Sequence, residues 1–505
     1  MMPRWSGGKK KVISSIAPLP PRGGGVGGEG TVDRQKQLAA HATVPLSPTL
    51  SLKGRGGLNH RATKIIRNTM SNTPHSAATR PLRFITCGSV DDGKSTLIGR
   101  LLYDSKALMI DQLESLGKAR GSQSKEGQLD LSLVTDGLEA EREQGITIDV
   151  AYRYFATPKR KFIIADAPGH EQYTRNMVTG ASKSDVAVVL IDVIKLDFSQ
   201  PTVTLLPQTK RHTALAGLLG LQHIVVAVNK MDAINFDAAK FERVVTAFGE
   251  LAASLNIKHF TAIPLSALDG DGVVAHTART AWFQGPALLP HLESLVLDDT
   301  HGTSATTKAH IAVQWVTRDE SDDHLRWVTG DVVEAAINVG DAISVFPSGA
   351  TAVVAALRTG RGETNTAAPG EAVAIRFDRQ VDVARGDWIM AGNASETQLT
   401  QRTTATLAWL DNAPLTLGRR YVVRHGARWL PARVSAIASR LDLASAEWRV
   451  GDGAGAEVKA NDLVRAEIEF AQALPLAAFA ESAARGAFVL VDPGTNATAA
   501  AGMIL

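Results

Sequence analysis

A phosphate-binding pattern stands at residues 88–95. The string Gly88-Ser89-Val90-Asp91-Asp92-Gly93-Lys94-Ser95, followed by Thr96, fits the spacing G-x-x-x-x-G-K-S/T. Glycines let backbone N–H groups curl around a phosphate chain, and a lysine there adds a positive charge for the β- and γ-phosphates. A serine hydroxyl after the lysine can bind Mg²⁺. The pattern therefore predicts a nucleoside triphosphate site with Ser95 as a magnesium ligand.

A second motif could act on the terminal phosphate. It reads Asp166-Ala167-Pro168-Gly169-His170. An aspartate there can hold Mg²⁺ through water, and the Gly169 N–H can contact a γ-phosphate. An Asp-x-x-Gly string is common, and a lone histidine is usually structural. Beside a phosphate loop, however, we expect His170 to orient the attacking water.

Thr147 is the expected switch threonine, a third magnesium ligand after Ser95 and Asp166. It ends the polar stretch 142–147, which is too hydrophilic to belong to a core. With Lys94 and His170 it completes the predicted catalytic set.

Two further motifs indicate which base is bound. Asn229-Lys230-Met231-Asp232 offers a carboxylate that can accept hydrogen bonds from N1–H and the 2-amino group of guanine. Adenine has no such pair of donors, so Asp232 predicts GTP rather than ATP. The backbone of Ser266-Ala267-Leu268 is expected to meet the base from the other side. Each motif alone is weak, but all of them in this order predict a GTPase.

Short apolar runs precede these motifs and alternate with longer helical stretches. Strands without polar alternation, separated by helices, are typical of a parallel sheet covered on both faces. We therefore expect an α/β P-loop GTPase domain over residues 82–298. The runs are Leu82–Cys87, Phe162–Ala165, Val186–Ile191, Ile224–Val228 and Thr261–Leu265.

The chain changes to an all-β pattern after His310. Short apolar runs bounded by Gly, Pro, Asp and Asn predict two β-barrel domains, over residues 308–394 and 400–505. The expected strands are Ile311–Val316, Ala342–Phe346, Thr351–Leu357, Ala372–Phe377, Tyr421–Arg424, Arg433–Ile437, Leu463–Phe470 and Ala487–Val491.

Composition limits the number of domains, the cellular compartment and the partners that can be expected. A chain of 505 residues must form several domains. Its single cysteine, Cys87, excludes an intramolecular disulfide, and no apolar run approaches the roughly 20 residues of a membrane helix. Residues 1–69 carry 12 Lys and Arg against 2 acidic residues, so the remainder has a net charge of −7. We expect a cytoplasmic protein with neither a nucleic-acid nor a membrane partner.

Residues 1–80 form a basic, glycine-rich head without helical or strand periodicity. We expect this head to be disordered. Two interpretations stay open: a basic targeting peptide, or an extension ahead of a true start near Met70. The second is favoured, because Met70 opens a plausible start about a dozen residues before the first strand.

These motifs together resemble the translation-factor class of GTPases, whose members carry Asp-x-Pro-Gly-His and β-barrels after the G domain. Within this class, the detailed sequence of the motifs is similar to that of the GTPase subunit of bacterial heterodimeric sulfate adenylyltransferase. The similar strings lie at residues 89–102, 136–155, 173–182 and 496–504. The chain differs from the family in two places. The segment from Leu196 to Thr209 is longer, and the sequence near residues 318–326 is divergent.

The resemblance implies a reaction and a partner. A smaller subunit would bind ATP and sulfate and form adenylyl sulfate and pyrophosphate, while GTP hydrolysis on this chain drives the uphill synthesis. GTP and Mg²⁺ are the implied cofactors. The chain shows no second phosphate loop, so no adenylyl-sulfate kinase activity is expected.

The same residues bear on two rival functions. A translation elongation factor would need basic barrel surfaces, which the charge of −7 disfavours. A GTP-switched scaffold would have no need of Thr147, Asp166 and His170 for hydrolysis.

Overall fold

The computed structural model describes residues 80–108, 131, 149–170, 174–297, 308–318, 326–392, 399–443, 445–450 and 457–505. These residues belong to one compact unit, which spans 75–505. The expectations for Thr147, for the string 136–148 and for the head up to residue 79 lie outside the described residues.

The first domain is built on a six-stranded sheet with the order β2-β3-β1-β4-β5-β6. Every neighbouring pair is parallel except β2 with β3, which is antiparallel. The strands are β1 (Leu82–Cys87), β2 (Ala151–Ala156), β3 (Lys161–Asp166), β4 (Val186–Asp192), β5 (His223–Asn229) and β6 (Phe260–Pro264).

Side chains of the central strands alternate between two cores. In β4, Val186, Val188 and Leu190 join one buried cluster, while Ala187 and Val189 join the other. All seven residues of β4 are buried. Because both faces are covered, the strand needs apolar residues along its length, and the sequence is apolar from Val186 to Ile191; only the last residue, Asp192, is polar.

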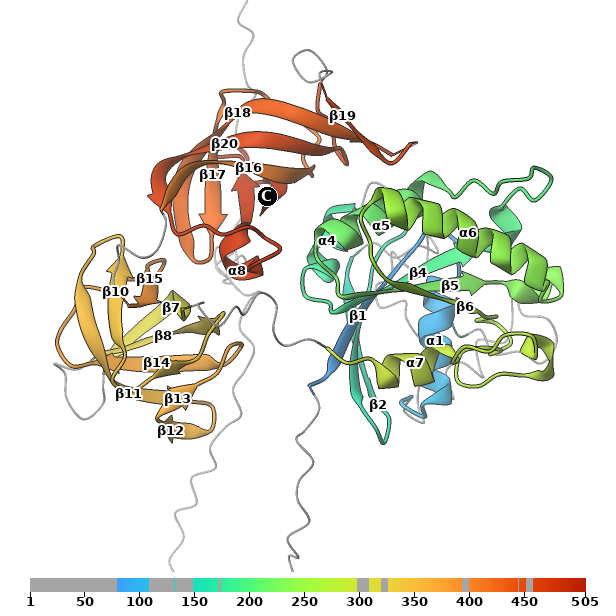
Figure 1. The fold of residues 1–505 in the computed structure, drawn as a ribbon, viewed down its shortest axis with the longest axis horizontal. Coiled ribbons are helices and arrows are strands. Elements are labelled where there is room, and N and C mark those ends of the chain that lie inside the picture. Colours follow the sequence, from blue (N-terminus) through green and yellow to red (C-terminus); the bar gives the residue numbers. More distant parts are fainter. Residues whose placement is uncertain are drawn as a thin grey trace, which may run out of the picture. The chain divides into compact units, whose positions relative to one another are not determined.

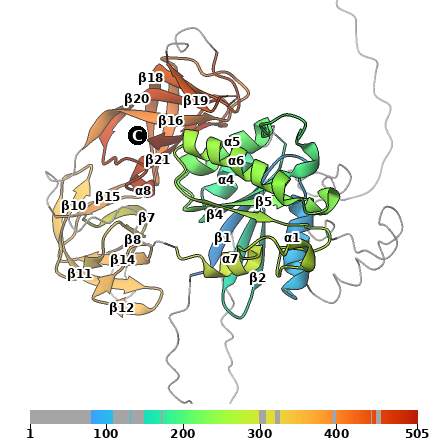
Figure 2. The same ribbon diagram turned by 45° about the vertical axis from the view of Figure 1, so that its right-hand side comes forward.

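Helices cover both faces of this sheet. Figures 1 and 2 show α5 and α6 on one face, and α1 and α7 on the other. The helices are α1 (Lys94–Asp104), α4 (Thr174–Ala181), α5 (Pro207–Leu218), α6 (Ala238–Ser254) and α7 (Leu288–Ser294), with short 3-10 turns η3 (Val193–Lys195), η4 (Met231–Ile234) and η5 (Ala278–Thr280). No helix among the described residues is long and apolar enough to cross a membrane.

The second domain is all-β. Its main sheet has the order β10-β15-β7-β8-β14-β11-β12, and β10 also pairs with β11. Most of its buried apolar side chains form a core of their own, whereas Phe346, Trp388 and Met390 join the core of the third domain. The strands are β7 (His310–Arg318), β8 (Arg326–Val333), β9 (Ile337–Asn338), β10 (Ala342–Phe346), β11 (Thr351–Thr359), β12 (Gly362–Thr364), β13 (Thr366–Ala367), β14 (Ala372–Phe377) and β15 (Trp388–Ala391).

The third domain is also all-β, with the order β17-β21-β22-β16-β20-β18-β19 and an extra pairing of β17 with β18. Its elements are β16 (Thr400–Trp409), β17 (Arg420–His425), β18 (Arg428–Asp442), β19 (Glu447–Val450), β20 (Leu463–Leu474), α8 (Ala483–Gly486), β21 (Ala487–Val491) and β22 (Thr498–Ile504). The predicted fold class, an α/β GTPase domain followed by two β-barrel domains, is confirmed; the predicted boundaries between the domains stay predictions.

Candidate nucleotide-binding site

The four predicted motifs leave the same edge of the G-domain sheet. The phosphate loop follows β1, the string 166–170 begins at the last residue of β3, the string 229–232 begins at the last residue of β5, and the string 266–268 follows β6. The register pairs these strands in parallel, so their carboxyl ends lie together. Ligands of open α/β sheets bind at this edge.

Loop 88–95 has a curled backbone that needs glycine. Gly93 has φ +89°, and a Cβ there would lie 2.4 Å from the side-chain nitrogen Nδ2 of Asn229. Asp91 also has a left-handed backbone, with φ 62°. Helix α1 begins at Lys94, so its first N–H groups, including those of Ser95 and Thr96, lie at the end of the loop. This is the helix N-terminus that favours phosphate.

Lys94 is buried within the loop. Its Nζ donates to the carbonyl oxygens of Ser89 at 2.6 Å and Gly88 at 3.3 Å. Burial lowers the pKa of Lys94, and the carboxylates of Asp92 and Asp166 oppose that shift. The two carbonyl oxygens fix the position of the Lys94 amino group before any phosphate arrives.

His212 supports the loop from α5, and the sequence analysis did not find it. Its Nδ1 accepts the Gly88 N–H at 3.1 Å. The ring is fully buried, and burial together with the charges of Lys94 and Arg211 lowers its pKa to about 3. His212 is therefore neutral near pH 7, with its own proton on Nε2. His212 lies in the polar first half of α5, among Thr209, Lys210 and Arg211, so nothing in the local sequence distinguishes it.

The string after β3 passes directly over Lys94. Asp166, Ala167, Pro168 and Gly169 are buried, and His170 is half-buried. A Cβ on Gly169 would lie 2.4 Å from the Lys94 Nζ. Gln208 on α5 donates from Nε2 to the Gly169 carbonyl at 3.2 Å. The structure thus brings the second motif against the phosphate loop, as the sequence predicts.

The donors present suit magnesium rather than a transition metal. Within the described parts of the chain, no group of three or more His, Cys, Asp or Glu side chains is placed to hold a metal ion. Asp166 lies opposite Thr86 in the register and accepts its hydroxyl at 3.3 Å, beside the buried Lys94. One carboxylate and the Ser95 hydroxyl fit Mg²⁺, which takes few protein oxygens and keeps substrate phosphate and water as its other ligands.

Asn229 joins three loops. Its Nδ2 donates to the Asp92 carbonyl at 2.8 Å, and its Oδ1 accepts the Ala267 N–H at 3.0 Å. The side chain predicted to bind the nucleotide therefore also ties the phosphate loop to the loop after β6.

Among the residues that the structure describes, the Asp232 carboxylate makes no hydrogen bond or ion pair, whereas its neighbours are fixed. Met231 is buried and its N–H donates to the Leu265 carbonyl at 3.3 Å. Lys230 has φ 60°, and its Nζ pairs with Asp192 at 2.7 Å. These contacts hold the turn that presents Asp232.

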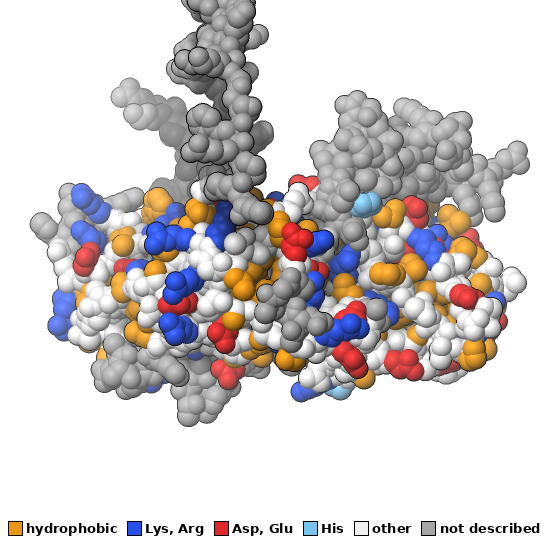
Figure 3. Space-filling view, turned by 90° about the horizontal axis from the view of Figure 1, so that it is seen from above, with side chains coloured by type: hydrophobic (Ala, Val, Ile, Leu, Met, Phe, Trp, Pro, Cys, Tyr) orange, Lys and Arg blue, Asp and Glu red, His pale blue; other side chains and the backbone are white. Residues whose placement is uncertain are grey.

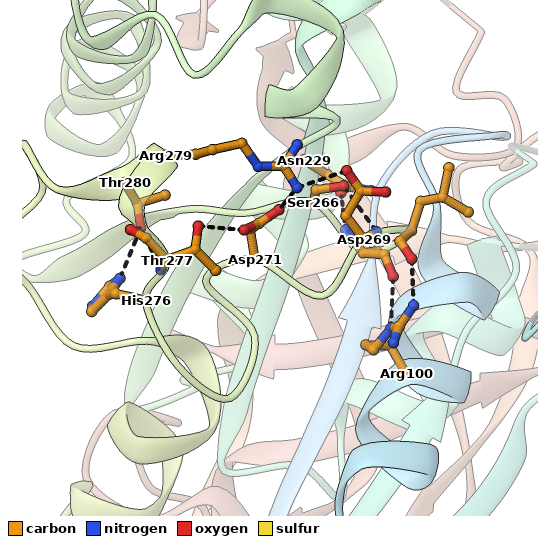
Figure 4. Close-up of polar contacts among 11 residues, drawn as sticks. Arg100, Asn229, Ser266, Asp269, Asp271, His276, Thr277, Arg279 and Thr280 are labelled. Carbon is orange, nitrogen blue, oxygen red and sulfur yellow. Dashed lines mark hydrogen bonds and ion pairs between the residues drawn. The ribbon is translucent and has the colours of Figure 1, made fainter. Parts of the chain in front are cut away.

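The loop after β6 is fixed by polar contacts that the sequence did not suggest. Figure 4 shows Arg100 of α1 reaching this loop; it donates to the carbonyls of Ala267 and Leu268. Asp271 pairs with Arg279, and Ser266 Oγ accepts the Asp269 N–H at 3.2 Å. The loop therefore has a set conformation around the backbone of residues 266–268.

The face drawn in Figure 3 carries side chains of both charges. On the face drawn in Figure 3, Lys and Arg side chains alternate with Asp and Glu and do not gather into one broad basic patch. Two hollows of about 420 and 240 Å³ share Val316, Arg326 and Val383, all in the second domain. Neither hollow is lined by a residue of the nucleotide motifs.

Two family models match the chain. The model described as "Elongation factor Tu GTP binding domain" matches residues 79–322, and the one described as "GTP-eEF1A C-terminal domain-like" matches residues 402–505. Among solved structures, the GTPase-like domain of S. cerevisiae Ski7 bound to GTP is 17% identical, with a TM-score of 0.44, and the match covers 84% of this chain and 97% of that one.

Curated relatives have a higher sequence identity to this chain. The chain is 46% identical to a bifunctional enzyme CysN/CysC of Mycobacterium tuberculosis, over 84% of this chain and 67% of that protein. It is 43% identical to sulfate adenylyltransferase subunit 1 of Laribacter hongkongensis, over 84% of this chain and 85% of that protein. The chain therefore belongs to the family of sulfate adenylyltransferase subunit 1, within the translation-factor class of GTPases.

Proposed function

We propose that this chain binds and hydrolyses GTP and, with a smaller cytoplasmic subunit that binds ATP and sulfate, makes adenylyl sulfate and pyrophosphate. The observation that carries the GTP part is the convergence of four loops at one edge of the G-domain sheet. The sulfate part rests on the family, since the names of the relatives carry it.

The phosphate chain would lie in loop 88–95. Backbone N–H groups at the start of α1 would donate to its oxygens, and Lys94 would exchange its carbonyl partners for the β- and γ-phosphates. The Gly169 N–H would approach the γ-phosphate from the other side, because a Cβ at this position would already touch Lys94.

Magnesium would be held by Ser95 and Asp166, with Thr147 as a further ligand. When bound, the ion offsets negative charge on the phosphate oxygens. The Asp166 carboxylate already has a fixed orientation, because the Thr86 hydroxyl donates a hydrogen bond to it.

Hydrolysis needs a water placed in line with the γ-phosphorus. His170 follows Gly169 directly and is half-buried, so its ring would lie beside the γ-phosphate. The water oxygen bonds to the γ-phosphorus while the bond to the bridging oxygen of GDP breaks, and the water proton leaves with the phosphate product. His170 orients this water.

Guanine would be selected by Asp232. Its carboxylate would accept from N1–H and the 2-amino group, while the backbone of residues 266–268, fixed by Asn229 and Arg100, covers the base.

The test is a change of nucleotide. Asp232→Asn should lose affinity for GTP and gain affinity for xanthosine triphosphate, because the amide can donate to the 2-oxo group that replaces the 2-amino group. Isothermal calorimetry with both nucleotides measures this change, and Lys94→Ala, which should bind neither, is the matched control. A variant that still prefers GTP would overturn the assignment of Asp232.

A further inference from the structure

Lys195 lies beside the phosphate loop although it belongs to none of the nucleotide motifs. It ends η3, the turn that directly follows β4. Its Nζ lies 2.9 Å from Asp92 Oδ1 and also donates to the Val90 carbonyl. Lys195 therefore contacts two residues of loop 88–95 from outside the loop.

Its partner Asp92 closes the loop on itself. Asp92 Oδ2 accepts the Ser89 N–H at 2.5 Å, while Oδ1 faces Lys195. The Asp92 side chain is 0% exposed and that of Lys195 is 31% exposed. A buried carboxylate needs a nearby positive charge, so this pair differs from an ordinary surface ion pair.

The segment that follows Lys195 is anchored on the G domain. Leu196, Val203 and Leu205 are buried. Arg243 of α6 donates to the carbonyls of Phe198 at 3.0 Å and of Pro201, and its guanidinium lies 5.3 Å from the centre of the Phe198 ring. The segment that is longer here than in the resembling family is thus attached to α6.

We propose that Lys195 is a positioning residue that pairs with Asp92, keeps that carboxylate bonded to the Ser89 N–H, and so holds loop 88–95 in its phosphate-binding conformation. The inference rests on the proposed function in one respect, that this loop binds GTP. Lys195 acts through Asp92 and not by contact with the nucleotide, so its removal should speed nucleotide release.

The first test measures release of fluorescent GDP by stopped flow. Lys195→Met should release it at least about tenfold faster, as expected when one partner of a buried charge pair is truncated. Lys195→Arg should restore most of the slow release, and the exposed Lys258→Met should release at the wild-type rate. In an Asp92→Asn background, Lys195→Met should add less than about twofold, because no carboxylate remains for the lysine to neutralise.

An undiminished effect of Lys195→Met in the Asp92→Asn background would overturn the proposal, since it would mean that the lysine acts by a route other than Asp92, either through the Val90 carbonyl or on the nucleotide itself. So would an unchanged release rate in the single variant.

A second readout needs no nucleotide. Cys87 is the only cysteine of the chain, is buried, and directly precedes the loop. In nucleotide-free protein, a thiol reagent should label Cys87 faster in Lys195→Met than in wild type or Lys258→Met, with circular dichroism showing that all three are folded. If wild type binds no GTP but this difference is present, the proposed function fails and the positioning role stands. If wild type binds GTP and labelling is unchanged, the positioning role fails.

Discussion

At the scale of single residues, the site depends on charges that are fixed before the ligand arrives. Lys94 and Asp166 are both buried, and each has a protein partner in the structure: backbone oxygens for the lysine, the Thr86 hydroxyl for the carboxylate. Such preorganisation lowers the cost of ordering these groups when phosphate and Mg²⁺ bind. His170 has a different task, because it concerns the water and not the binding of the nucleotide.

Replacing His170 should therefore separate binding from hydrolysis. His170→Ala is expected to leave GTP affinity within about twofold and to slow hydrolysis by a factor on the order of 10²–10⁴, the range for a positioned group that acts on water. Phosphate release under single-turnover conditions measures the rate, and the exposed His259→Ala is the control. Equal turnover by the variant and wild type would remove His170 from the mechanism.

At the scale of elements, the central strands could be predicted closely from the sequence. The run Leu82–Cys87 is β1, and Val186–Ile191 is β4 less its last residue. Buried strands of a parallel sheet are apolar at every position, so they stand out from their surroundings. The motifs were predictable for a related reason, since a parallel sheet brings strand ends together whatever the intervening helices are.

Strands with weaker patterns were missed. β2 is an edge strand whose residues are mostly half-buried or exposed, so no apolar run marks it. β8 follows the stretch of divergent sequence near residues 318–326, and no strand was predicted there. Edge position removes the apolar signal of β2. β8 does carry buried apolar residues, Trp327, Val328 and Val332, but Thr329, Gly330 and Asp331 interrupt the run.

The supporting contacts of the site could not be predicted from sequence. His212, Arg100 and Lys195 lie 124, 167 and 105 residues from their partners in the phosphate loop or the base loop. Nothing local distinguishes these side chains from other polar residues, because their function depends on packing between elements that only the folded chain brings together.

At the scale of the whole molecule, buried polar side chains connect the two β domains. Glu334 lies 3.1 Å from His310 Nδ1 and 2.8 Å from Arg485 Nε, which belongs to the third domain. Nearby, His425 is buried and stacks on Trp388, with ring centres 5.3 Å apart. Arg175 of α4 donates to the Leu410 carbonyl at 2.9 Å, so the G domain also contacts the third domain.

These buried groups make stability depend on pH. Burial lowers the pKa of His212 to about 3 and that of His425 to about 4. Below about pH 6.5 these two histidines are protonated in the unfolded chain but stay neutral in the folded one. Each should therefore lower the free energy of unfolding by on the order of 1.4 kcal/mol for every pH unit below that value. Burial alone would raise the pKa of Glu334, but His310, Ser482 and Arg485 together lower it, so its contribution is lost at still lower pH.

We therefore expect the melting temperature to fall as the pH is lowered from 7.5 to 5.5. Calorimetric scans measure this fall, and the double variant His212→Gln His425→Gln should show a shallower slope. A melting temperature that stays constant over this range would contradict the assignment of both rings as buried and neutral.

The central claim, that GTP bound to this chain drives adenylyl sulfate synthesis, is tested most directly by pyrophosphate release from ATP and sulfate. The chain is combined with the smaller subunit, and release is followed with and without GTP. GTP should stimulate the wild-type complex, whereas the Asp232→Asn complex should respond to xanthosine triphosphate and not to GTP. Equal pyrophosphate release with and without GTP, or stimulation of the Asp232→Asn complex by GTP alone, would contradict the claim.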